Sequence, residues 1–101
     1  MVNVFFCIDD RGYVVDLMRC KWFLVVDVDG KRVVDRILVG RGVVDPEVFG
    51  DVFEEYDPYI LFTCGVDEDL MLGIEEYGIH IYIVKCIDFN DVLDEMYGFR
   101  V

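Results

Sequence analysis

Seven residues near the start of the chain, Val2 to Ile8 (VNVFFCI), form a short and nearly continuous apolar run. Asp9, Asp10 and Gly12 follow this run and end it. A short apolar segment bounded by turn residues is typical of a β-strand that is buried on both faces. Such a strand has neighbouring strands beside it and other layers above and below it. The run therefore predicts the central strand of a covered sheet.

Two further strands are predicted in the first half of the chain, at residues 22–28 (WFLVVDV) and 31–39 (KRVVDRILV). Asp29-Gly30 stands between them, and this dipeptide between two apolar runs is a strong short-range signal for a β-hairpin. Together with the first strand, these segments predict a three-stranded antiparallel unit.

The second half of the chain alternates helix and strand. Three segments begin with acidic residues that favour a helix start and continue with apolar residues at helical spacing, after Asp45, Asp67 and Asp88. Short apolar strands at 59–63 (YILFT) and 79–84 (IHIYIV) lie between them. The order β-β-β-α-β-α-β-α predicts a single α/β domain over residues 1–101, with a mixed sheet whose two later strands run parallel to the first.

The charge balance limits the partners that the chain can have. Nine Lys and Arg residues against 21 Asp and Glu residues give a formal net charge of −12, and this negative field repels phosphate backbones. We therefore expect no nucleic-acid partner. No apolar run approaches the roughly 18 residues that span a bilayer, so we expect no membrane partner and a cytoplasmic protein. In a reducing compartment the four cysteines are expected to remain thiols, without disulfides.

A strand, a Cys64-Gly65 loop, a helix, Gly78-Ile79 and another strand follow one another in the second half of the chain. With the segments VVDLMRCKWFLVVDVDGK, YDPYILFTCGVDEDLMLGIEEYGIHIYIVK and FNDVLDEMY, this pattern resembles the dinitrogenase iron-molybdenum cofactor biosynthesis family over nearly the whole chain. The resemblance implies a ribonuclease-H-like fold. It also implies a small accessory domain that binds or carries an iron–sulfur or iron–molybdenum cofactor precursor and is not a catalyst.

The family's His-Phe-Gly-Arg element is replaced here by Asp16, Leu17, Met18 and Arg19. An imidazole that could ligate iron thus gives way to Asp16, which is a harder oxygen donor. The loop after Cys64 keeps one glycine, Gly65. The resemblance carries both residues over as candidates for contact with a cofactor.

Three cysteines are expected at the carboxyl ends of the parallel strands: Cys7, Cys64 and Cys86. Ligand crevices in open α/β sheets lie at that edge, and thiolates are the ligands that soft iron and iron–sulfur species prefer. The sequence therefore suggests a metal site lined by these three thiols, with Cys20 as a fourth contributor or an exposed residue. The competing interpretation is that they fill the core, since free cysteine is among the most buried residue types.

Four aspartates are expected at the same edge: Asp9, Asp10, Asp67 and Asp69. Clustered carboxylates could hold a divalent cation for hydrolysis, but acidic residues after strands are ordinarily turn and helix-cap residues, and we favour that role. The one histidine, His80, alternates with apolar neighbours in a strand and is expected to be structural. Gly40-Arg41-Gly42 lacks the spacing of a phosphate-binding loop and predicts a mobile loop.

Together these observations predict a three-layer, ribonuclease-H-like domain with a mixed five-stranded sheet in the order 3-2-1-4-5. It is expected to act by binding and not by turnover. The first hypothesis is an accessory or carrier domain for a metal cluster, and the second is a protein-interaction module that has lost the cofactor site. A homodimer formed by edge pairing of residues 31–39 stays open, although the basic residues of that segment would discourage it.

Overall fold

The computed structural model describes residues 1–40 and 44–101 of the chain. Residues 41–43 lie outside this range, and with them most of the Gly40-Arg41-Gly42 stretch, so the loop expected there is not described. The elements in chain order are β1 (Asn3–Ile8), the 3-10 turn η1 (Leu17–Arg19), β2 (Trp22–Asp27), β3 (Arg32–Leu38), α1 (Pro46–Tyr56), β4 (Ile60–Thr63), α2 (Glu68–Glu75), β5 (His80–Ile83) and α3 (Phe89–Tyr97). The predicted strands and helices are confirmed.

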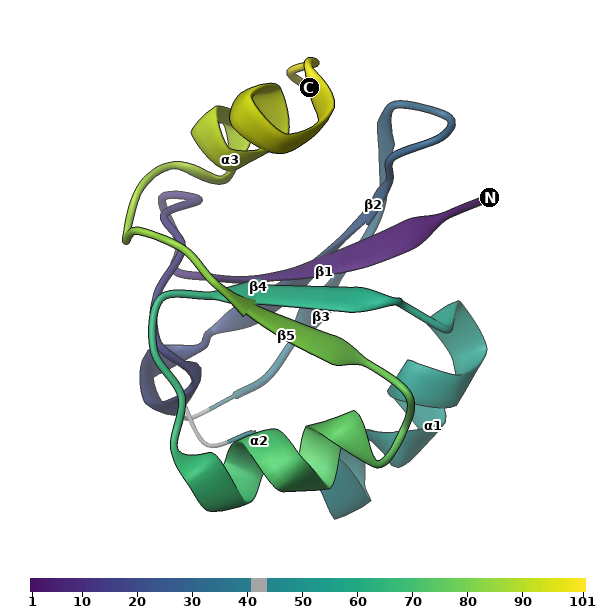
Figure 1. Cartoon of the computed structure of the whole chain (residues 1–101), viewed down its shortest axis with the longest axis vertical. Coiled ribbons are helices and arrows are strands. Elements are labelled where there is room, and N and C mark those ends of the chain that lie inside the picture. The colour runs from purple at the N-terminus through teal and green to yellow at the C-terminus, as the bar shows by residue number, and fades with distance from the viewer. Residues whose placement is uncertain (41–43) are drawn as a thin grey trace.

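The strands form one five-stranded sheet in the order β3-β2-β1-β4-β5, as predicted. β2 pairs antiparallel with both β1 and β3, whereas β4 runs parallel to β1 and β5 runs parallel to β4. Figure 1 shows α1 and α2 against one face of this sheet and α3 against the other. The domain therefore has three layers, and the carboxyl ends of β1, β4 and β5 meet at one rim.

β1 is buried along its whole length, as its unbroken apolar sequence predicts. Because successive side chains of a strand point to opposite faces, β1 contributes to two separate cores. Phe5 packs with Phe23 and Phe53 on the side of α1 and α2, and we call this the α1/α2-side core. Phe6 stacks on Phe62 on the opposite side, in what we call the α3-side core.

Each helix begins at the aspartate that the sequence indicates. The side chains of Asp45, Asp67 and Asp88 accept hydrogen bonds from main-chain N–H groups in the first turns of α1, α2 and α3. Such caps satisfy N–H groups that have no partner inside the helix. Gly98 ends α3 with a positive φ of 74°, a conformation that glycine adopts without steric cost. Among the residues described, no helix combines the length and apolar character that crossing a bilayer requires.

The hairpin between β2 and β3 is organised by a buried carboxylate. Asp27 is only 4% exposed and accepts hydrogen bonds from the main-chain N–H groups of Val2, Asp29 and Gly30. The hydrogen bond from Gly30 is the main cause that lowers the pKa of Asp27 below its ordinary value, against the opposing effect of burial. The turn predicted at Asp29-Gly30 is confirmed. The residue with a positive φ in this turn is Lys31, which follows Gly30.

Replacing Asp27 with asparagine is expected to destabilise the protein in a pH-dependent way. Because the pKa of Asp27 is lower in the folded chain, its carboxylate stabilises the fold above the unfolded value of about 3.9, and this contribution is lost as the pH falls through the folded pKa. Urea unfolding between pH 7 and pH 2 should show wild type and Asp27→Asn converging at low pH. Asp29→Asn, at an exposed site in the same turn, controls for the lost charge. If the difference in the free energy of unfolding between wild type and Asp27→Asn stayed constant as the pH fell below 4, the lowered pKa of Asp27 would be contradicted.

Candidate functional site

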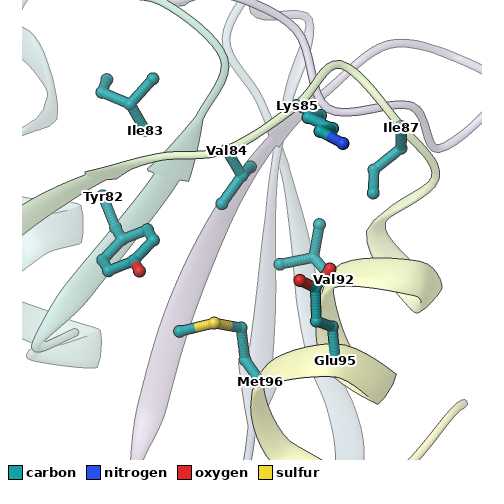
Figure 2. Close-up of a pocket in the computed structure, with 8 residues that line it drawn as sticks. All are labelled: Tyr82, Ile83, Val84, Lys85, Ile87, Val92, Glu95 and Met96. Atoms are coloured by element: carbon teal, nitrogen blue, oxygen red, sulfur yellow. The ribbon is translucent and has the colours of Figure 1, made fainter.

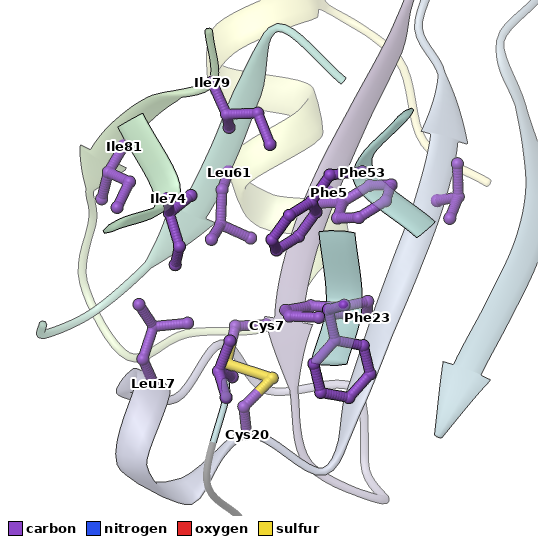
Figure 3. Close-up of a cluster of buried hydrophobic side chains, with 13 residues drawn as sticks. Phe5, Cys7, Leu17, Cys20, Phe23, Phe53, Leu61, Ile74, Ile79 and Ile81 are labelled. Carbon is purple, nitrogen blue, oxygen red and sulfur yellow. A yellow bond between two sulfur atoms is a disulfide. The ribbon is translucent and has the colours of Figure 1, made fainter. Parts of the chain in front are cut away.

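The four cysteines form two pairs, and the first pair lies inside the α1/α2-side core. Cys7, near the end of β1, and Cys20, just before β2, are joined by a disulfide with 5.3 Å between their Cα atoms. Both residues are completely buried among Leu17, Phe23 and their neighbours. Figure 3 shows the sulfur–sulfur bond enclosed by these side chains. This pair is part of the core and does not face the rim of the sheet.

The second pair, Cys64 and Cys86, lies on the opposite side of the sheet. These residues are also joined by a disulfide, again with 5.3 Å between the Cα atoms. Cys64 directly follows β4 and packs, half-buried, against the α3-side core, whereas Cys86 is exposed in the connection between β5 and α3. The second pair therefore stands at the rim, within reach of solvent.

The pairing of β1 with β4 explains why Cys7 and Cys64 are separated. In this pairing Phe6 lies opposite Phe62. Two residues further along the two segments come Ile8 and Cys64, so Cys64 shares the face of Ile8, while Cys7 points to the other face. The expected three-thiol site is therefore wrong in its geometry, because the sheet separates Cys7 from Cys64.

The expectation that all four cysteines remain thiols is also corrected, since both pairs are disulfides. Within residues 1–40 and 44–101, no group of three or more His, Cys, Asp and Glu side chains is placed to hold a metal ion. Cys20, left open from the sequence as a fourth contributor or an exposed residue, is the buried partner of Cys7. A resident cluster bound by three or four of these cysteines does not fit this arrangement.

Asp16 and Gly65, the other two candidate residues, meet at the loop after β4, where the Asp16 carbonyl oxygen also lies 3.6 Å from the Cys7 sulfur on the α1/α2 side of the sheet. The Leu17 N–H donates to the Gly65 carbonyl over 2.9 Å, and the Cys64 N–H donates to the Val15 carbonyl over 3.2 Å. These bonds hold the Asp16 segment against the loop after β4. A Cβ atom at Gly65 would lie 3.2 Å from the Asp16 Cβ, so the absence of a side chain allows this close approach. The Asp16 carboxylate itself accepts from the Arg19 N–H and caps η1.

A pocket of about 200 Å³ lies next to Cys86, between β5 and α3. Its lining is formed by Tyr82, Ile83, Val84, Lys85, Ile87, Val92, Glu95 and Met96. In Figure 2, Val84 and Ile87 face Val92 and Met96 of α3 across the opening. Most of the lining side chains are apolar, but polar atoms, those of one cationic and one anionic side chain among them, also face the pocket. The lining residues Lys85 and Ile87 directly precede and follow Cys86.

The sequence did not single out this pocket, because its lining comes from two segments that meet only in the folded chain. Alternation along β5 places Tyr82 and Val84 on the same face of the strand. Helical spacing places Val92 and Met96 on one side of α3. These two patterns indicate which side chains share a face, but they do not indicate that a space remains between the two faces.

The aspartates at the rim form turns, caps and ion pairs. Asp9 accepts from the N–H groups of Arg11 and Tyr13, and Asp67 caps α2 through the N–H groups of Asp69 and Leu70. This agrees with the structural role that we favoured for the acidic residues.

Asp10 contacts Lys21 and Trp22 and not a neighbouring carboxylate. Its carboxylate accepts from the Lys21 Nζ over 2.6 Å and from the Trp22 Nε1 over 3.0 Å. These two hydrogen bonds, that of Lys21 first, lower the pKa of Asp10 below its ordinary value. His80 lies exposed on edge strand β5, between the buried Ile79 and Ile81, as the alternation predicted.

Comparisons with known proteins give a structural match without a sequence match. No family model matches the chain, and no curated protein matches it significantly. The crystal structure of PH0822 superposes with a TM-score of 0.72 at 22% identity, over 96% of this chain and 91% of PH0822.

A protein from Thermotoga, TM1290, solved by NMR, superposes with a TM-score of 0.70 at 14% identity. The match covers 93% of this chain and 85% of TM1290, which belongs to the DUF35 family and is provisionally named a NifB protein. At these identities the comparisons establish the fold. The chain therefore has the same three-layer fold as PH0822 and TM1290.

Proposed function

We propose that this chain is a non-catalytic binding domain that holds an iron–sulfur or iron–molybdenum cofactor precursor as cargo, at Cys64 and Cys86 in their reduced form. The observation that carries the proposal is the position of this pair at the carboxyl-end rim, beside a pocket. Ligands of open α/β sheets bind at this edge. The provisional name of the Thermotoga protein supports the same class of cargo.

The donor set fits cargo that is released better than it fits a resident cluster. Thiolates are the preferred ligands of soft iron species, and reduction of this pair would supply two of them. A cluster held by two protein sulfurs keeps other coordination positions for its own sulfides or for a receiving protein. The exposure of Cys86 gives such a receiver access. Cys7 is not part of the proposed site, because it lies in the core on the other side of the sheet.

The acidic residues support binding and not turnover. A hydrolase that uses two metal ions needs carboxylates that converge, yet Asp9 and Asp67 accept main-chain hydrogen bonds in separate turns, and Asp10 pairs with Lys21. The net charge of −12 also disfavours a nucleic-acid substrate, whose phosphate backbone it repels. The expected activity is therefore uptake and release of cargo.

Reduced protein titrated with ferrous iron and sulfide without oxygen is expected to develop thiolate-to-iron charge-transfer absorbance. The Cys64→Ser/Cys86→Ser variant should lose this absorbance, because serine hydroxyls are poor ligands for soft iron. The Cys7→Ala/Cys20→Ala variant is the matched control, since it removes the same number of sulfurs from the core and should retain the absorbance. Circular dichroism checks that each variant is folded.

Two outcomes would contradict the cargo proposal. One is the absence of the absorbance band in reduced wild type, and the other is its persistence in the Cys64→Ser/Cys86→Ser variant. Either outcome favours the second candidate function, a protein-interaction module. The observation in its favour is the exposure of large apolar side chains around the pocket, since Ile83 on edge strand β5 is 52% exposed and Met96 on α3 is 40% exposed. A homodimer formed by edge pairing of residues 31–39, as considered from the sequence, remains part of this second candidate.

A further inference from the structure

The two disulfides differ sharply in how accessible they are. Cys7 and Cys20 are 0% exposed, whereas Cys86 is exposed and Cys64 is half-buried. Thiol–disulfide exchange needs a thiolate to approach one of the sulfur atoms directly. In the folded chain such an approach is open at Cys86 and closed at the buried pair.

The Cys64–Cys86 bond also fixes one short stretch of the pocket wall. On one side of Cys86, the Val84 N–H donates to the Thr63 carbonyl over 2.9 Å. On the other side, the Ile87 carbonyl accepts from the Val14 N–H over 2.8 Å. These bonds do not involve the disulfide, so the ends of the stretch stay attached to the sheet when the disulfide opens. Opening it would loosen mainly Cys86 and the adjoining pocket-lining residue Lys85, whose carbonyl still accepts from the Ile87 N–H over 2.9 Å.

We propose that the Cys64–Cys86 disulfide is reversibly reduced by a dithiol through thiol–disulfide exchange. The Cys7–Cys20 disulfide, in contrast, is a permanent structural link. One thiolate of the reductant attacks the Cys86 sulfur, the Cys64–Cys86 bond breaks, and Cys64 leaves as a thiolate and takes up a proton. The second thiolate of the reductant then displaces the Cys86 sulfur, which is protonated in turn. Two electrons and two protons pass to the protein, and the reductant becomes a disulfide.

This exchange would regulate the site described above, and that regulatory role rests on the proposed cargo function. In the disulfide state the two sulfurs cannot ligate iron, because the thiolate is the metal ligand. In the dithiol state both sulfurs can ligate iron, and the part of the pocket wall at Lys85 loosens. Cargo uptake would then depend on prior reduction of this one pair.

Native protein treated with dithiothreitol, quenched with iodoacetamide and analysed by peptide mass spectrometry tests the exchange without any metal. Cys64 and Cys86 should be alkylated at least about 100-fold faster than Cys7 and Cys20, because the buried pair reacts only after an opening that costs several kcal/mol. Circular dichroism should stay native while the exposed pair is reduced. Reduction of both pairs at the same rate, or of neither before unfolding in urea, would overturn the proposal.

The Cys7→Ala/Cys20→Ala variant is the matched control and should show an unchanged rate of exchange at Cys64 and Cys86. The exchange measurement and the iron titration can also contradict the two proposals independently of each other. Selective exchange without iron absorbance contradicts the cargo function and leaves the exchange site standing. Iron absorbance in protein that was reduced in urea and refolded without oxygen, combined with a lack of exchange in native protein, contradicts the exchange site alone.

Discussion

Replacing Phe5 with alanine is expected to lower the free energy of unfolding by about 3–5 kcal/mol, the range found for large buried aromatic residues. Phe5 is fully buried in the middle of the sheet, and its ring centroid lies 5.3 Å from that of Phe23 and 6.1 Å from that of Phe53. These rings come from β1, β2 and α1. Because β1 and β2 are held by their pairing in the sheet, they cannot move to fill the cavity that alanine would leave.

Urea unfolding of wild type and Phe5→Ala measures this loss. The control is Val48→Ala, because Val48 is 68% exposed on α1 and alanine is the better helix former. That variant should stay within about 0.5 kcal/mol of wild type. A loss below about 1 kcal/mol for Phe5→Ala would mean that the α1/α2-side core is not packed around this ring.

Removing the buried disulfide with Cys7→Ala/Cys20→Ala is expected to cost about 3 kcal/mol from chain entropy alone, for a link between residues 13 apart in sequence. The loss of two packed sulfurs from the core adds to this cost. The expected result in urea is therefore a midpoint well below that of wild type, with the fold retained.

The comparison variant is Cys64→Ala/Cys86→Ala, whose link joins residues 22 apart. Its entropic loss is similar, but these sulfurs lie at the rim, so less packing is lost. The buried double variant should thus be the less stable of the two. Wild-type stability for the buried double variant would show that Cys7 and Cys20 are not linked in the native protein, and the opposite ranking would contradict the larger packing contribution assigned to the buried pair.

The fold was largely predictable because its signals are local. The unbroken apolar run of β1 indicated burial on both faces, and all six residues of the strand are buried. Asp45, followed by Pro46, marked the start of α1, and it caps that helix. These features depend on residues within one or two turns of each other, so that the sequence carries them directly.

The site was only partly predictable, because it depends on which face each strand presents. Gly65 and Asp16 were expected near Cys64, and hydrogen bonds between their segments bring them together. Cys7 was expected there too, and it lies on the opposite side of the sheet. A shift of one residue in the pairing of β1 with β4 would have placed Cys7 and Cys64 on the same face of the sheet. Because both strands are apolar on both faces, their sequences do not indicate which register forms.

By itself, the sequence determined the order of the elements, the central place of β1 and the helix caps, since periodicity and capping are local properties. The strand–helix–strand order then set the direction of the later strands. Only the tertiary structure decided that the cysteines form two pairs on opposite faces, one inside the core and one at the rim beside a pocket. The physical reason is that strand register and side-chain parity arise from contacts between segments far apart in the chain.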